Sequence, residues 1–314
     1  MLRFLVHRLL SAVPVLFIVS LVSFALIWLV PGDVASSIAD PGATIEELAR
    51  IRARLNLDKP LHLQMLHWYG NLLQGDLGQS FLLNRGVGQA IAERLPVTLS
   101  LTGIALVIAL TIGVLSGVIA AVRHGTWLDQ SFMVLALLGL SIPDFWLGLV
   151  GIYTFAVALG WLPSGGFVPM DQSFAGWARS MTLPALTLAL TQMGLLARIT
   201  RSSMLEVLRL DYVRTARAKG LPDLQVVGKH ALTNALIPVI TVIGVIVGVM
   251  LGGVVVIEQV FSLPGVGRLI IGAVLRRDYP VIQGGLLLLA SIYVFVNIAV
   301  DMLYALIDPR VRYD

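Results

Sequence analysis

The chain has 314 residues, of which 57% are apolar and only 13% are charged, whereas a soluble domain carries about 25% charged residues. This composition excludes an ordinary soluble protein, and the absence of cysteine excludes disulfides, zinc–thiolate sites and iron–sulfur clusters. The sequence pI near 9.6 does not indicate a nucleic-acid partner, because the basic residues cluster in loops, where membrane topology explains them.

Long apolar runs divide the chain, and several exceed the roughly 18 residues that mark a membrane span. Their continuity argues against the alternating strands of a membrane barrel. The sequence therefore predicts an all-α polytopic membrane protein, a single transmembrane domain over residues 1–314 with six transmembrane helices. The predicted spans cover residues 9–30, 97–122, 131–158, 181–197, 235–257 and 284–307.

The first apolar run, Leu9–Val30, follows a short basic stretch, as the core of a signal peptide does. Its length of about 22 residues exceeds such a core, and no small-residue cleavage site follows it. We therefore expect a retained first span.

The polar segment at residues 31–96 is expected to lie outside the cytoplasm and to contain short helices. Thr44 and Glu47 are spaced as a capping box at the start of an amphipathic helix. A second short helix is expected over Leu61–Leu73, and the glycines of Gly75–Gly78 predict a turn.

The distribution of Lys and Arg orients the chain in the membrane. If the N-terminus is inside, the inside loops hold 12 basic residues in about 61 positions, and the outside loops hold 10 in about 115. The inside loops are then residues 1–8, 122–130, 198–234 and 308–314. We expect both termini to be cytoplasmic.

Polar residues at membrane depth need a protein or water neighbour. Asp144 follows Pro143 inside the third span, so it lies either in a kinked segment that lines a pathway or at a helix break near the interface. Asn297 and Asp301 share one face of the last span. They are expected either to form hydrogen bonds between helices or to line a translocation pathway. Glu258, at the end of the fifth span, is expected to be an interfacial carboxylate rather than a gate.

Small residues form stripes on two predicted spans. Gly244, Gly248 and Gly252 recur every four residues on the fifth span, and Gly113 and Gly117 repeat the pattern on the second. The pattern predicts close helix approach, inside the bundle or across a dimer.

The sequence carries no motif for catalysis or nucleotide binding. It contains no Walker A loop, no H-E-x-x-H and no G-x-S-x-G. The nearest histidines, His62 and His67, are five residues apart and do not share a helix face, so we expect no metal site.

The polar stretch Arg198–Asn234 is the most basic loop and carries seven Lys and Arg residues. Within it, Asp211–Gly220 has helical spacing, and Gly220 suits the left-handed position that ends a helix. The sequence alone leaves two interpretations open, a loop that faces lipid headgroups or a short helix that docks on a soluble subunit.

The segment DYVRTARAKGL followed by HALTNALIPVI resembles the cytoplasmic EAA-type loop of ABC-importer permeases, in particular their peptide/nickel subfamily. Other segments agree over nearly the full length: PGD (31–33), LNLDKPL (55–61), GDLGQS (75–80), ERLPVTLSL (93–101), SIPDFW (141–146), IEQVFSLPGVGRL (257–269), RDYPVIQG (277–284) and DPRVR (308–312). Arg214 and Thr215 stand where the general pattern has Glu and Ala, while Ala216 and Gly220 match it. Without this glutamate, the loop lacks one expected salt bridge to an ATPase subunit. Docking on that subunit would then depend on shape and on basic side chains.

The resemblance implies a type I ABC-importer permease fold in the bacterial cytoplasmic (inner) membrane and a non-catalytic subunit for di-/oligopeptides. It implies no cofactor on this chain, with ATP and Mg²⁺ bound to partner subunits. The implied partners are a homologous second permease, two ABC ATPase subunits, an extracytoplasmic substrate-binding protein and the lipid bilayer. Nickel or glutathione import, an ion-coupled secondary transporter and a membrane-embedded enzyme are the alternatives.

Three groups of site residues follow from this interpretation. The residues expected to couple to the ATPase are Tyr212, Val213 and Ala216 as groove contacts, Arg217 and Lys219 as polar anchors, and the terminal Gly220. The residues expected on the translocation pathway are Asp144, Asn297 and Asp301. The residues expected to face the binding protein are Asp76, Leu77, Pro264, Gly265 and Arg268.

Overall fold

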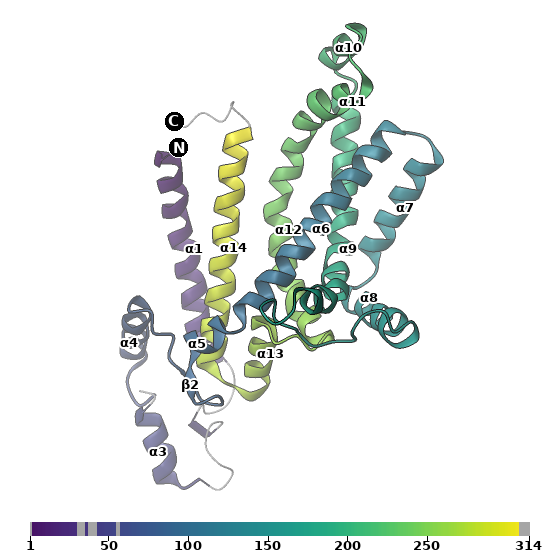
Figure 1. Ribbon diagram of the computed structural model, residues 1–314. Coiled ribbons are helices and arrows are strands. Elements are labelled where there is room, and N and C mark those ends of the chain that lie inside the picture. Colours follow the sequence, from purple (N-terminus) through teal and green to yellow (C-terminus); the bar gives the residue numbers. More distant parts are fainter. Residues whose placement is uncertain (1, 30–34, 37–42, 55–56, 308–314) are drawn as a thin grey trace. The chain divides into compact units, whose positions relative to one another are not determined.

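The structure, a computed structural model, describes residues 2–29, 35–36, 43–54 and 57–307 (Figure 1). Five of the described helices are long and apolar enough to cross a membrane, and a bent pair raises the number to as many as six. The expected features at residues 31–33, 55–56 and 308–312 lie outside the described residues.

Helices make up nearly all of the regular structure. In chain order, the elements up to the middle of the chain are α1 (Leu2–Leu29), α3 (Ile45–Arg54), α4 (Leu61–Leu73), β1 (Gln79–Ser80), β2 (Arg85–Gly86), α5 (Val87–Ala92), α6 (Leu95–Val122), α7 (Trp127–Ser141), α8 (Asp144–Gly151) and the π-helical η1 (Ile152–Ala158). The remaining elements are α9 (Phe174–Val207), α10 (Asp211–Ala218), α11 (Asp223–Gln225), the π-helical η2 (Val226–Ala231), α12 (Leu232–Val260), α13 (Val266–Arg276) and α14 (Tyr279–Ile307).

The chain forms two compact units. We call residues 1–6, 97–264 and 293–314 the helical unit, because it contains α6 to α12. We call residues 7–96 and 265–292 the hairpin unit, because it contains the β1–β2 hairpin. The helices α1 and α14 each contribute to both units.

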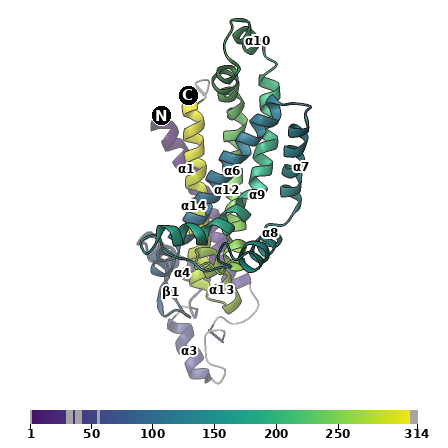
Figure 2. The same cartoon turned by 45° about the vertical axis from the view of Figure 1, so that its right-hand side comes forward.

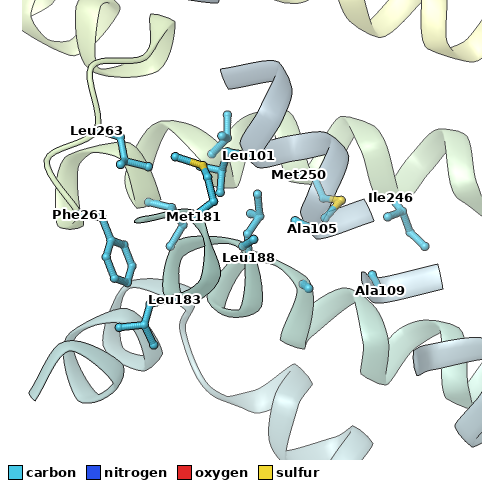
Figure 3. Close-up of a cluster of buried hydrophobic side chains, with 14 of the residues drawn as sticks. Leu101, Ala105, Ala109, Met181, Leu183, Leu188, Ile246, Met250, Phe261 and Leu263 are labelled. Carbon is cyan, nitrogen blue, oxygen red and sulfur yellow. The ribbon is translucent and has the colours of Figure 1, made fainter. Parts of the chain in front are cut away.

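The core of the helical unit lies between α6, α9 and α12 (Figures 2 and 3). Each helix supplies buried apolar side chains toward the other two, and the segment that follows α12 closes one end of the cluster. The labelled residues of this core are Leu101, Ala105, Ala109, Met181, Leu183, Leu188, Ile246, Met250, Phe261 and Leu263.

Glycines set how closely these helices approach, as predicted for the interior of the bundle. A Cβ at Gly117 of α6 would lie 2.6 Å from the Ala197 carbonyl oxygen of α9. On α12, Cβ atoms at Gly244 and Gly248 would collide with Asn297 and Tyr293 of α14. Gly113, Gly117, Gly244 and Gly248 therefore serve contacts within the chain, whereas no atom lies within 4 Å of the Cβ position at Gly252.

The predicted third span is broken where the sequence places a proline. The axes of α7 and of the segment Asp144–Ala158 differ by 103°. Ile142 precedes Pro143 and adopts an extended backbone, because the proline ring disfavours helical geometry at the residue before it. The predicted interruption is confirmed, and the pair is either one broken span or a re-entrant loop.

Two predicted polar connections are shorter than the hydropathy pattern indicated. The helix α9 begins at Phe174, inside the expected connection 160–180, where the Ser173 hydroxyl accepts a bond from the Gly176 amide. It then continues to Val207, ten residues beyond the predicted end of the fourth span. Hydropathy misses such ends because the extra turns bury one face only, for example through Thr200 and Met204.

The hairpin unit is built around one apolar cluster. Buried side chains of α5 and α13 pack together, among them Val87, Ile91, Val266 and Ile270. The antiparallel strands pair Gln79 with Gly86 and Ser80 with Arg85. In the same unit the predicted capping box at the start of α3 is present, with Thr44 and Glu47 bonded reciprocally.

Overpacking between α6 and α9 should destabilise the protein. We expect Gly117→Ala to lower the free energy of unfolding by about 1–3 kcal/mol, because the new methyl group meets backbone atoms that cannot rotate away. The measurement is the apparent melting temperature of the purified protein in detergent. Gly103→Ala on the same helix is the matched control, since no atom lies within 4 Å of its Cβ position. Equal melting temperatures for the two variants would contradict the prediction.

Candidate functional site

The helix α10 is held against the chain by its apolar face. Val213 is fully buried and Ala216 is 7% exposed, and both pack with the fully buried Val226 of η2. Val207, Leu208 and Leu221 complete this cluster. The expectation that Val213 and Ala216 contact a groove in a partner is therefore corrected, because these side chains anchor α10 to its own chain.

The C-terminal end of α10 has the predicted left-handed glycine. Gly220 has φ +76°, its amide donates to the Arg217 carbonyl, and the Leu221 amide donates to the Ala216 carbonyl. This pair of bonds is a Schellman motif, which satisfies carbonyls that the helix end leaves open. The shape of the turn at Gly220 is thus fixed locally.

Tyr212 joins the two halves of the segment that resembles the EAA loop. Its hydroxyl donates to the backbone carbonyl of His230 at 3.2 Å and accepts from the side-chain amide of Asn234 at 2.9 Å. The ring remains 41% exposed. Tyr212 therefore ties α10 to η2 and to the start of α12.

The exposed face of α10 is basic. Arg214, Arg217 and Lys219 are exposed. Arg217 lies 3.6 Å from Asp223, and Arg214 lies 3.5 Å from Asp211, in ion pairs whose carboxylates are open to solvent. Such exposed pairs contribute little to stability, so the basic side chains can exchange these partners for groups on another protein.

A buried ion pair joins the neighbouring helix ends and was not predicted from the sequence. Arg201 of α9 donates to both carboxylate oxygens of Asp129 in α7, at 2.5 and 2.8 Å. The amide of Gly125 donates to the same carboxylate, and His124 lies 3.1 Å from it. The Asp129 side chain is 4% exposed. This clasp fixes the α6–α7 turn to α9.

The clasp and α10 belong to the same end of the helical unit. Ala121 near the end of α6 packs with Met204 of α9, with Ala231 at the end of η2 and with Ala235 at the start of α12. The ends of α6, α7, α9 and α12 are therefore tied together where α10 is attached (Figure 2).

The three expected pathway residues do not converge on one site. The half-buried carboxylate of Asp144 accepts a hydrogen bond from Thr191 of α9 and lies beside Gly253 of α12. Asn297 donates to the carbonyl of Tyr293 in its own helix and lies against Gly244. The two glycines are nine residues apart on α12, about 13 Å along its axis, and Asp301 lies one turn beyond Asn297.

Glu258 departs from its expected position. Its side chain is fully buried, and the Thr98 hydroxyl donates to its carboxylate at 2.6 Å. The expectation of an interfacial carboxylate is therefore corrected, since Glu258 connects α12 to the start of α6 inside the helical unit.

The residues expected to face a binding protein differ in exposure. In the hairpin unit Asp76 is exposed and accepts a bond from the Gly78 amide at 2.8 Å, whereas Leu77 and Arg268 are half-buried and Gly265 is buried at the start of α13. Pro264, in the helical unit, is exposed.

A buried carboxylate organises this part of the hairpin unit. Asp278 is 1% exposed, and it accepts bonds from the Ser80 hydroxyl at 2.5 Å and from the Leu82 amide at 3.3 Å. The Ser80 hydroxyl in turn accepts from the Leu83 amide at 3.0 Å. The separate motifs GDLGQS and RDYPVIQG thus meet in one contact.

Among the residues that the structure describes, no group of three or more His, Asp or Glu side chains could hold a metal ion. His67 contacts the Leu63 carbonyl of its own helix at 2.9 Å.

Comparison with known proteins connects these features to a family. Residues 113–313 match the binding-protein-dependent transport system inner membrane component, and residues 1–102 match the N-terminal part of such a membrane component. The two matches together cover nearly the whole chain.

Relatives of similar length share this pattern. The di/tripeptide transport system permease protein DppB of Pseudomonas aeruginosa is 46% identical over 338 aligned residues, which cover 100% of this chain and 99% of the relative. A Brucella abortus protein whose name describes a peptide transport system permease is 51% identical over 310 residues, 99% of each chain. A chain of the MetNI methionine ABC transporter, solved in inward-facing conformations, shares the fold with a TM-score of 0.56 at 19% identity, over 70% of this chain and 97% of that chain.

Removal of the clasp charge should loosen the end of the helical unit. We expect Asp129→Asn to lower the free energy of unfolding by about 2 kcal/mol, because the Arg201 guanidinium loses a charged acceptor. A double-mutant cycle compares the melting temperatures of Asp129→Asn, of Arg201→Gln and of the variant that carries both substitutions. Asp211→Asn, in an exposed ion pair, is the control and should leave the melting temperature unchanged. Strict additivity in the cycle would show that the pair contributes nothing.

Proposed function

This chain belongs to the family of binding-protein-dependent transport system inner membrane components, and we propose that it forms half of the translocation pathway of an ATP-driven importer of di- and oligopeptides. The observation that carries the peptide assignment is the 46% identity, over the full length, to a permease named for di- and tripeptide transport. Nickel and glutathione remain the alternative substrates within the same class.

The family fixes the class of activity. The chain is a permease subunit of an ABC transporter in the inner membrane and catalyses no reaction itself. Partner ATPase subunits hydrolyse ATP, and a substrate-binding protein delivers the cargo. We extend this to a homologous second permease, six spans with both termini in the cytoplasm, and ATP and Mg²⁺ bound only by the partners.

The coupling role falls to α10. Its buried side chains and the tie through Tyr212 hold it to the ends of α9 and α12, and its exposed basic face is free to bind an ATPase. When ATP closes the two ATPase subunits, a displacement of α10 moves both helix ends as a rigid body and opens the pathway outward. Arg214, at the position of the usual glutamate, makes this contact basic.

The remaining site assignments stay proposals. Asp144 is the best supported pathway residue, since it is half-buried at the break between α7 and α8. Asn297 and Asp301 lie on α14 and support the helix contacts of the pathway wall. The exposed Asp76 and Pro264 are the stronger contacts for a binding protein, and the more buried Leu77, Gly265 and Arg268 support their local structure.

Charge reversal on α10 should uncouple the ATPase. We expect Arg214→Glu with Lys219→Glu to reduce the ATPase that co-purifies with the tagged permease by roughly tenfold or more, because charged contacts at an interface contribute several kcal/mol. Arg214 and Lys219 are exposed, so these substitutions should preserve the fold. A bulky residue at the buried Ala216 would instead disturb the packing of α10. Arg276→Glu, on the exposed end of α13, is the matched control and should retain the ATPase. Full ATPase retention with normal uptake in the double variant would refute the coupling role.

Uptake measurements test the substrate and the energy source together. Cells that express the complete transporter should take up a labelled dipeptide until ATP is depleted and should continue when the proton gradient is collapsed. Excess di- and tripeptides should compete, whereas nickel and glutathione should not. Competition by nickel or glutathione would identify that compound as the substrate instead. Uptake that follows the proton gradient would favour a secondary transporter.

A further inference from the structure

The short helix α4 packs against the membrane-spanning part of α1. The Tyr69 ring stacks on Phe17 at a centroid distance of 6.1 Å, and the Trp68 ring lies 5.7 Å from that of Phe24. The Tyr69 hydroxyl also lies 2.8 Å from the Ser20 hydroxyl. Figure 1 shows α4 beside the lower end of α1. The helix α4 therefore lies against α1.

The contacts set the direction and the depth of α4. Two adjacent residues of α4 reach Phe17 and Phe24, which are about 10 Å apart along α1, so α4 crosses α1 instead of running along it. The apolar window of α1 covers Leu5–Leu26, and the contacts at Phe24, Ser20 and Phe17 lie about 3, 9 and 14 Å before its end, so their centre is about 9 Å deep. Interfacial helices lie about 5–10 Å into the boundary between headgroups and acyl chains.

The length of α4 excludes a span of its own. Its 13 residues extend about 20 Å, whereas the hydrocarbon core is about 30 Å thick. A helix that crosses a membrane span at this depth, and that is too short to traverse the bilayer, fits a position in the plane of the interface.

The faces of α4 that do not contact α1 divide into a mainly apolar flank, which the exposed His62 borders, and a polar flank. At 100° per residue, Leu63, Leu66 and Leu73 fall within about 80° of arc, and Leu66 and Leu73 are 63% and 87% exposed. The polar Gln64, His67 and Asn71 fall within about 60°, and this flank is centred about 120° from the apolar one.

The lipid-facing surface of α1 continues onto the apolar flank. Phe17, Ile18 and Val22 of α1 are each more than half exposed, as expected for side chains that face acyl chains. The ring of Phe17 is also the one on which Tyr69 stacks. Acyl chains that cover this face of α1 would therefore also meet α4 where Tyr69 stacks on Phe17.

The polar atoms of the contact suit the same environment. Ser20 is 4% exposed, and its hydroxyl finds partners in the Phe17 carbonyl and the Tyr69 hydroxyl. Without a partner, a hydroxyl at this depth would be costly. Trp and Tyr, the residues that α4 turns toward α1, are the side chains enriched at membrane interfaces.

We propose that α4 lies in the plane of the membrane interface beside α1, with Leu63, Leu66 and Leu73 among the acyl chains of the bilayer and His67 and Asn71 toward water. Its occupant is the surrounding lipid rather than another subunit. The proposal rests on the membrane placement of α1 and not on the substrate of the transporter, so the two can fail separately.

Site-directed spin labelling tests the proposal directly, since the chain has no native cysteine. Single variants Leu66→Cys and Asn71→Cys carry a nitroxide in the complete transporter, reconstituted in phospholipid vesicles. The accessibility to oxygen, which concentrates in acyl chains, is compared with the accessibility to a water-soluble nickel chelate. Ile18→Cys on α1 is the lipid control, and Ala49→Cys on the exposed face of α3 is the water control.

We expect the oxygen-to-nickel ratio at Leu66 to match that at Ile18 and to exceed the ratio at Asn71 several-fold. Low accessibility to both reagents at Leu66 would mean that a protein partner covers the flank, and a ratio like that of Ala49 would mean exposure to water. Either result overturns the proposal. Both labelled positions are exposed, so normal dipeptide uptake by the variants serves as the check on folding.

Discussion

Close packing on α9 is the constraint on which the helical unit depends. Lipid supplies no hydrophobic force between apolar helices, so their association rests on contact between backbones and on polar bonds. Gly117 lets α6 reach the α9 backbone, and a Cβ at Gly194 would meet the Ala136 carbonyl of α7 at 2.5 Å. The clasp between Asp129 and Arg201 then fixes these helices at one end. The position of α10 follows from this arrangement, because it is attached to helices that cannot move independently.

Attachment to two helices distinguishes α10 from an ordinary loop. One tether is apolar, a cluster of Val213 with Val207 and Leu208 at the end of α9, and the other is polar, from Tyr212 to the start of α12. A force on the exposed basic face is therefore transmitted to α9 and α12 together. The Schellman turn at Gly220 adds two backbone hydrogen bonds that define the end of the helix.

Local signals in the sequence predicted local structure well. Pro143 predicted the break between α7 and α8, Gly220 the end of α10, and Thr44 with Glu47 the cap of α3. Contacts between distant residues were not predictable, because no periodic pattern records them. Asp129 and Arg201 are 72 positions apart, and no feature of the sequence pairs them. In the same way, the helical spacing of α10 did not show that Val213 and Ala216 face their own chain. The span ends were misjudged for a related reason, since amphipathic turns extend a helix without adding hydropathy.

The bond between Ser80 and Asp278 has a consequence for the order in which the chain folds. The two residues are 198 positions apart, and the segment 97–264 of the helical unit lies between them in the sequence. During synthesis, residues 7–96 emerge long before α13 and must wait for Asp278 before the turn after β1 gains its acceptor. The helical unit, whose segment 97–264 is continuous, can assemble in the meantime. The turn after β1 is therefore made early in synthesis and gains its acceptor late.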